Sequence, residues 1–150
     1  MAYDLAVDPA NGALTLAGWA TIGAGQPRSA LEPALRPLIK GELDHRNGYV
    51  WLTIGGLAFG GLPCTLGLCF NGGAVSEAGW NLEMPDAVLE HGWPTRETSD
   101  REVAFCRQVL AGQIGREVPE EGLAFAWGRL WCAYDDKGGT ASTGLRYGAE

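Results

Sequence analysis

The chain has 150 residues, of which 46% are hydrophobic and 19% are charged, and its formal net charge at pH 7 is -7. A chain of this length can bury a sizeable core, so we expect residues 1–150 to form a single domain. Only 11 Lys and Arg stand against 18 Asp and Glu, which argues against a nucleic-acid partner because phosphate binding depends on clustered cations. The same acidity favours the approach of a basic partner.

The amino-terminal residues lack the features of an export signal. No basic segment precedes an apolar run, and Asp4 and Asp8 interrupt the start of the chain. Residues 50–70 are apolar, but glycines and a proline divide them, whereas a membrane helix needs about 20 uninterrupted residues. We therefore expect a cytoplasmic protein that does not bind a membrane.

Four cysteines occur in the chain, at positions Cys64, Cys69, Cys106 and Cys132. Because the sequence shows no export signal, they are predicted to be reduced and buried. Cys64 and Cys69 are an odd number of positions apart in a strand pattern, so they would point to opposite faces of a sheet and could not bind one metal ion together.

The amino-terminal third predicts a hairpin and an irregular segment. Weakly alternating residues 3–7 and 14–19 flank a turn-forming Asp-Pro-Ala-Asn-Gly cluster, which is typical of two paired strands. Residues 29–39 have leucines at helical spacing, but two prolines interrupt the backbone hydrogen bonds. We expect a single helical turn or an irregular segment there.

Three strands are predicted next, at residues 49–54, 62–70 and 74–82, because these segments are rich in apolar and β-branched residues or alternate in polarity. An Asn-Gly-Gly turn joins the last two strands. The glycine-rich residues 55–61 are predicted to be a loose link between the first two.

One helix is predicted, over about residues 99–115. Ser99 and Glu102 have the spacing of a capping box, and Gly115 is expected to end the helix. Its apolar stripe, which we expect to pack across one face of the sheet, consists of Val103, Cys106, Leu110 and Ile114.

The carboxy-terminal part predicts a further hairpin. Residues 123–134 alternate, with Phe125, Trp127, Arg129 and Trp131 on one side and small or apolar residues on the other, as in a strand. An Asp-Asp-Lys-Gly-Gly turn then leads to a returning strand at residues 140–147. The predicted fold class is therefore α+β, with a mostly antiparallel sheet of about six or seven strands and one main helix on one face.

The chain offers few residues for catalysis. It has no Gly-x-Ser-x-Gly motif, no Cys-x-x-Cys pair and only two histidines, His45 and His91, both in predicted turns or loops. Asp86 and Glu90 lie close to His91 in sequence but precede a helix-breaking Gly-Trp-Pro. We predict no catalytic residue, no cofactor and no metal ion.

Tryptophan is unusually frequent, with six residues. Tryptophans are favoured at binding hot spots and are also normal in large β cores, so both roles stay open. The candidate ligand-binding or partner-binding residues are Trp80, Trp93, Trp127, Arg129 and Trp131.

Four stretches carry a resemblance to known proteins: "LGLCFNGG", "WNLEM", "GWPTRETSDREVAFCRQVLAGQIG" and "WGRLWCAYDDKGGTASTGLRY". In this order they resemble an uncharacterised family of small bacterial α+β domains (a domain of unknown function). The shared features are a Phe-Asn-Gly hairpin, a Gly-Trp loop followed by a helix, and a Trp-Gly...Asp-Lys-Gly-Gly hairpin. The resemblance covers about two thirds of the chain and implies one antiparallel sheet with one helix, but no activity and no catalytic residue.

These observations predict a non-catalytic cytoplasmic protein-interaction module, of the immunity or adaptor kind, that binds a protein partner through an acidic and aromatic surface. Self-association as a homodimer through an open sheet face is one form of this prediction. The alternative is a small-ligand-binding protein or unassigned enzyme. Its pocket would lie between the sheet and residues 83–98, floored by Trp80, Trp127 or Trp131.

Overall fold

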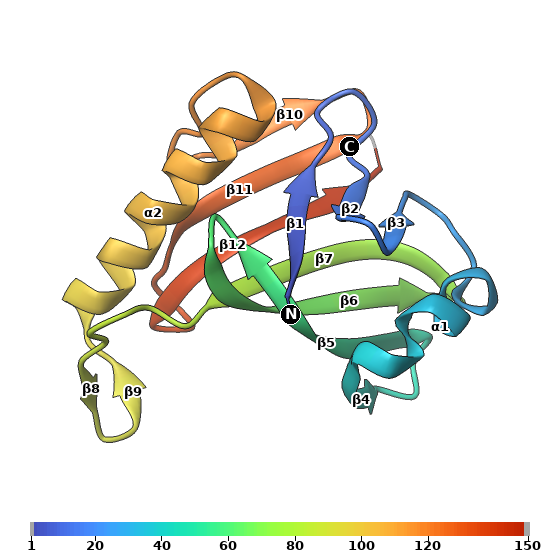
Figure 1. The fold of residues 1–150 in the computed structure, drawn as a ribbon, viewed down its shortest axis with the longest axis horizontal. Coiled ribbons are helices and arrows are strands. Elements are labelled where there is room, and N and C mark those ends of the chain that lie inside the picture. The colour runs from blue at the N-terminus through green and yellow to red at the C-terminus, as the bar shows by residue number, and fades with distance from the viewer. Residues whose placement is uncertain (1, 149–150) are drawn as a thin grey trace.

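A computed structural model describes residues 2–148 of the chain. Its largest feature is a strongly twisted ten-stranded sheet in the order β10-β11-β12-β7-β6-β5-β1-β2-β3, with β4 also paired to β5 (Figure 1). The strands are β1 (Tyr3–Val7), β2 (Leu14–Leu16), β3 (Ala20–Ile22), β4 (Ile39–Asp44), β5 (Tyr49–Phe59), β6 (Leu62–Asn71), β7 (Ala74–Leu82), β10 (Leu123–Phe125), β11 (Gly128–Asp135) and β12 (Thr140–Tyr147).

Two α-helices and a separate small hairpin complete the fold. They are α1 (Arg28–Leu35), followed by the 3-10 turn η1 (Arg36–Leu38), the long helix α2 (Arg96–Ile114), and the two-stranded hairpin of β8 (Leu89–Glu90) and β9 (Trp93–Pro94). The α+β class and the mostly antiparallel sheet are confirmed, since only β1 and β5 pair in parallel within residues 2–148. The predicted number of six or seven strands is wrong, because the sheet includes short strands that the sequence pattern did not reveal.

The strand β5 runs further than predicted. It continues through Gly55 and Gly56 to Phe59, and its register to β6 shifts between Ile54 and Leu57. Gly56 has a positive φ of 73°, which glycine adopts without strain, so the glycines form a bulge inside a strand and not a loop. The bulge lets β5 pair with β4 before it and with β1 after it.

The predicted strand at residues 123–134 is two strands. β10 and β11 form a tight hairpin in which Phe125 pairs with Gly128, so Trp127 lies in the turn. Gly128 has a φ of 151°, and a Cβ there would overlap the carbonyl oxygen of Arg146. The alternation predicted for this segment therefore holds within β11 but does not extend through Trp127.

The helical segments also differ from prediction at their ends. Where the sequence suggested a single turn or an irregular segment, α1 forms two turns and buries Leu31 and Leu35. Helix α2 begins at Arg96, earlier than Ser99, because the side chain of Thr95 caps it by accepting a hydrogen bond from the Thr98 N–H at 3.2 Å. Glu102 is therefore not part of a capping box.

The rest of the prediction for α2 is confirmed. Gly115 ends the helix in the left-handed conformation, with a φ of 80°. The buried stripe is the predicted one, Val103, Cys106, Leu110 and Ile114.

Three polar side chains of α2 fix its position on the sheet. Glu102 accepts a hydrogen bond from the Leu82 N–H in β7 at 3.1 Å, and Arg107 donates to the carbonyl of Cys132 in β11 at 2.8 Å. Gln113 accepts from the Val7 N–H and donates to a carbonyl of β1. Helix α2 therefore covers one face of the sheet, as predicted, and the opposite face carries no helix among residues 2–148 (Figure 1).

Replacing Gly144 in β12 with Ala should lower the free energy of unfolding by about 1–3 kcal/mol. The new Cβ would lie 2.5 Å from the carbonyl oxygen of Ala78, which belongs to backbone and cannot move aside cheaply. Urea denaturation, monitored by circular dichroism, measures this change in the free energy of unfolding.

Gly112→Ala is the matched control. Gly112 lies within α2, and a methyl group added there would have no neighbouring atom within 4 Å. The same replacement should therefore raise the free energy of unfolding by about 0.5–1 kcal/mol. Equal effects at both sites would contradict the close packing at Gly144.

Candidate interaction surface

The face of the sheet turned away from α2, which we call the outer face, carries a row of side chains in register. Arg129 and Trp131 alternate with Leu130 and Cys132, and the Cys132 thiol lies against α2 with its sulfur 3.5 Å from the Val103 carbonyl oxygen. Arg129 and Trp131 therefore point to the outer face. Pairing across six strands places on one row Leu43, Trp51, Cys69, Glu77, Arg146 and Arg129.

A row of glycines runs beside it. Gly67, Gly79 and Gly144 are direct partners across β6, β7 and β12, and Trp131 is the next partner along the row. A Cβ at Gly144 would lie 2.8 Å from Cζ2 of Trp131, and one at Gly67 would lie 3.4 Å from Cε3 of Trp51. The half-buried indoles of Trp51 and Trp131 thus lie close to Gly67 and Gly144, at the two ends of the glycine row. Gly79 lies between these two glycines.

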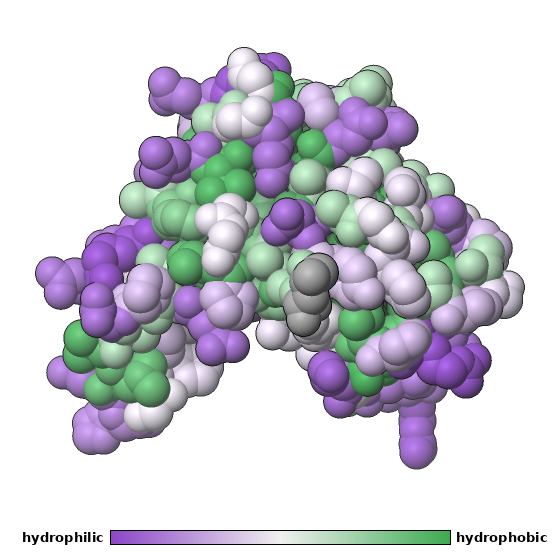
Figure 2. All heavy atoms as spheres, viewed as in Figure 1, coloured by the Kyte–Doolittle hydropathy of each residue, from purple (hydrophilic) through white to green (hydrophobic). Residues whose placement is uncertain are grey.

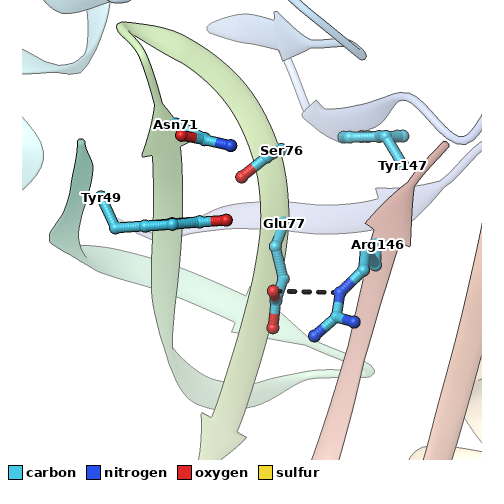
Figure 3. Close-up of a pocket in the computed structure, with 6 residues that line it drawn as sticks. All are labelled: Tyr49, Asn71, Ser76, Glu77, Arg146 and Tyr147. Atoms are coloured by element: carbon cyan, nitrogen blue, oxygen red, sulfur yellow. Dashed lines mark hydrogen bonds and ion pairs between the residues drawn. The ribbon is translucent and has the colours of Figure 1, made fainter. Parts of the chain in front are cut away.

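A hollow of about 450 Å³ adjoins the row (Figure 3). Glu77 and Arg146 form an ion pair across it at 3.2 Å, and polar side chains of the neighbouring strands complete its lining, which consists of Tyr49, Asn71, Ser76, Glu77, Arg146 and Tyr147. The Tyr147 hydroxyl donates to the carbonyl of Gly12 at 2.6 Å, and burial raises the pKa of Tyr147 to about 12. The hollow therefore presents hydrogen-bonding groups and a salt bridge that a protein or ligand surface could contact.

The five predicted site residues do not meet at one place. Arg129 and Trp131 share the outer face, where the Trp131 indole donates to the Ser142 hydroxyl at 3.0 Å. Trp93 lies on the β8–β9 hairpin and is exposed. The hypothesis that these residues bind a partner stays a prediction. Arg129 and Trp93 are exposed, Trp131 and Trp127 are half-buried, and Trp80 is buried.

Trp80 and Trp127 have packing roles. Trp80 is 1% exposed and its ring lies 5.6 Å from that of Phe59 in the core, with no acceptor for its N–H among residues 2–148. Trp127 stacks on Phe125 and donates to the carbonyl of Pro9 at 2.9 Å. This bond ties the β10–β11 turn to the turn between β1 and β2.

The outer face also contains residues that were not predicted from the sequence. Tyr49 and Trp51 alternate with the buried Leu52 and Ile54, so their opposite direction could have been deduced from the pattern of β5. Which of the two faces of the sheet is exposed to solvent depends on where α2 packs. The alternation alone therefore could not identify Trp51 as a surface candidate.

The predicted pocket between the sheet and residues 83–98 exists only in part. A hollow of about 290 Å³ lies there, but no tryptophan is among its lining residues, which are Leu82, Glu83, Met84, Ala87, Leu89, Pro94, Thr98 and Glu102. Trp80 instead borders a smaller hollow of about 200 Å³ beside β12. The expected tryptophan floor at residues 83–98 is therefore wrong.

The cysteines are free and buried, as predicted. Burial raises the pKa of the Cys64 thiol to about 12. A hydrogen bond with Cys132, together with burial, raises the pKa of Cys106. Because the thiolate is the reactive form, both side chains act as small apolar groups of the core.

Metal-ligating clusters and membrane-spanning helices are both missing from residues 2–148. Within this range, no group of three or more His, Cys, Asp and Glu side chains is placed to hold a metal ion. No helix of the described chain has both the length and the apolar character needed to span a bilayer.

Neither a family model nor a curated protein matches the sequence. Among solved structures, the fold is similar to a chain in the structure of "Rhs1-CT in complex with cognate immunity protein RhsI1", with a TM-score of 0.52 and 16% sequence identity. The similarity covers 95% of this chain and 86% of that chain. It therefore extends over almost the whole α+β architecture and shows a shared fold.

The buried carboxylate of Glu102 should make stability depend on pH. Desolvation raises the pKa of Glu102, so its stabilising contribution is complete below the pKa of the unfolded chain and is lost as the pH rises through the folded value. Glu102→Gln cannot ionise. The original protein therefore loses this contribution as the pH rises, and the variant does not. The difference in the free energy of unfolding, variant minus original, should increase from about pH 4 to about pH 8.

Urea unfolding at a series of pH values measures this difference. Glu120→Gln, at an exposed carboxylate, is the matched control for a Glu-to-Gln change. A difference for Glu102→Gln that stays constant across the pH range would show that the desolvation of Glu102 has no energetic effect.

Proposed function

We propose that this protein is an immunity-like interaction module without catalytic activity, which binds a protein partner through the outer face of its sheet. The observation that carries the proposal is the outer face itself. It presents two half-buried indoles, Trp51 and Trp131, beside the Glu77–Arg146 ion pair, and α2 packs on the other side. Aromatic and arginine side chains are the ones enriched at the centres of protein interfaces.

The structural similarity supports the same proposal. The similar chain comes from a complex of Rhs1-CT with its cognate immunity protein. A chain of this fold therefore takes part in a specific complex between two proteins. We infer by analogy that the present chain also acts by binding a protein.

Charge suggests what kind of protein the partner is. The formal net charge of -7 attracts a basic surface and repels an acidic one. Two copies of this chain carry the same net charge, so we favour a basic partner over a homodimer. Self-association through the outer face is the second form of the proposal.

Trp131, Arg129 and Trp93 are the predicted site residues that we propose contact the partner, together with Tyr49 and Trp51. Trp80 lies in the core, and the half-buried Trp127 packs on Phe125 at the β10–β11 turn. The small-ligand alternative, the single-domain organisation, the cytoplasmic location and the resemblance to an uncharacterised bacterial family stay predictions.

Trp131→Ala and Tyr49→Ala should each weaken recovery of the protein partner by about fivefold or more, because truncating a hot-spot aromatic costs more than about 1 kcal/mol. The tagged protein and each variant would be purified from the native host, and the co-purified proteins quantified by mass spectrometry. Circular dichroism would show that each variant is folded.

Trp19→Ala is the matched control. Trp19 is also exposed, but its ring stacks on Tyr3 and its indole donates to Ala34, away from the outer face. We expect this variant to recover the partner normally. If no protein co-purifies with the original chain, or if all three variants behave alike, the proposed function is wrong.

Sedimentation equilibrium should give the mass of a monomer for the isolated protein, because like charges oppose association of two copies. A dimer that dissociates on Trp131→Ala would instead assign the outer face to self-association. A dimer unaffected by this change would use another surface.

A further inference from the structure

The β8–β9 hairpin concentrates exposed apolar side chains. Val88, Leu89 and Trp93 are 51%, 59% and 55% exposed, and they lie within one short stretch of the chain. Figure 2 shows hydrophobic spheres gathered on the projecting lobe where Figure 1 places β8 and β9. Soluble proteins rarely cluster large apolar side chains in the open without a binding role.

The hairpin is held in place before any partner arrives. His91 and Gly92 both have positive φ, 54° and 79°, which closes a tight two-residue turn. The Trp93 indole donates to the carbonyl of Gly139 at 3.1 Å, in the loop between β11 and β12. Val88 exchanges hydrogen bonds with the Thr98 hydroxyl of α2. A preformed surface loses little entropy on binding.

The hollow of about 290 Å³ lies at the base of this hairpin and combines two kinds of lining. Leu82, Met84, Leu89 and Pro94 supply apolar walls. Glu102, a side chain only 9% exposed, supplies a carboxylate that also accepts the Leu82 N–H. Apolar walls around a desolvated carboxylate suit a long aliphatic stem that ends in a cation.

The surroundings have the matching charge. Residues 83–101 contain five carboxylates and two guanidinium groups. Both guanidinium groups are already engaged: Arg96 pairs with Asp100 at 2.9 Å, and Arg101 donates to the carbonyl of Asp86. Five carboxylates and two guanidinium groups give residues 83–101 a net charge of -3, and one of these carboxylates, Glu83, lines the hollow itself. The segment would therefore attract a basic side chain and repel an acidic one.

We infer that this hollow receives a lysine or arginine side chain of a basic protein partner, with the stem on Leu89 and Pro94 and the cation beside Glu102. The inference rests on the proposed function, since it identifies the chemistry of the partner. The hairpin then anchors the partner where β7 ends, on the side of the sheet that α2 covers.

The test uses the full chain, labelled with ¹⁵N, and a hexalysine peptide with blocked ends as the probe. Amide signals of residues 82–102 should shift in a saturable manner. Two matched peptides separate charge from shape: one acetylated at every Nζ, and one of 2,3-diaminopropionic acid, whose ammonium group is on a single methylene. Both should fail to reproduce these shifts, because the first lacks the cation and the second cannot reach Glu102.

Glu102→Gln should weaken hexalysine binding about tenfold, because it removes a desolvated partner charge but keeps an acceptor for Leu82. Glu97→Gln removes the same charge from an exposed position of α2 and should have a much smaller effect. Leu89→Ala, which removes part of the wall, should also weaken binding. Equal losses for the two glutamine variants, or shifts spread over all acidic parts of the chain, would overturn the inference.

The outcomes separate this inference from the proposed function. If Trp131→Ala abolishes partner recovery while Glu102→Gln leaves hexalysine binding unchanged, the outer face binds the partner and the hollow does not receive its cation. If hexalysine binds as described but no protein co-purifies, the hollow recognises cations and the proposed function is wrong.

Discussion

The attachment of α2 to three strands is the constraint on which the rest of the structure depends. Glu102, Arg107 and Gln113 bond to the backbone of β7, β11 and β1. In the order of the sheet, β12 separates β11 from β7, and β6 and β5 separate β7 from β1. These bonds hold α2 at three points from its first half to its last turn, so the helix stays on this face of the sheet. Its apolar stripe buries the inner face, and the outer face must meet water or a partner.

The shape of the outer face depends on three glycines that carry no side chain. Three glycines in register remove the side chains that would otherwise fill the middle of the face, and the indoles of Trp51 and Trp131 occupy part of that space. Glycine is costly in a strand because it loses the most conformational freedom on folding. At Gly67 and Gly144 this cost has a physical reason, because the indoles of Trp51 and Trp131 lie close to the backbone there.

Local chemistry explains which elements could be predicted from the sequence. The turns at residues 8–12 and 135–139 contain their own glycine and Asx signals, and the α2 stripe repeats with helical spacing. Strand β4 has no such signal, because it is an exposed edge strand whose pairing is decided by β5. The break at Trp127 was hidden because its side-chain pattern continues that of β11, while the backbone reverses at Ala126 and Trp127.

Glu102 shows why the candidate site was harder to predict than the fold. Its spacing from Ser99 fits a capping box, yet Thr95 caps the helix and Glu102 turns to the end of β7. A carboxylate in this position is desolvated, which opposes its ionisation and lowers stability at neutral pH. A glutamine could accept the same backbone hydrogen bond without this cost. A cation from outside the chain, placed beside Glu102, would offset the cost of desolvating its charged form.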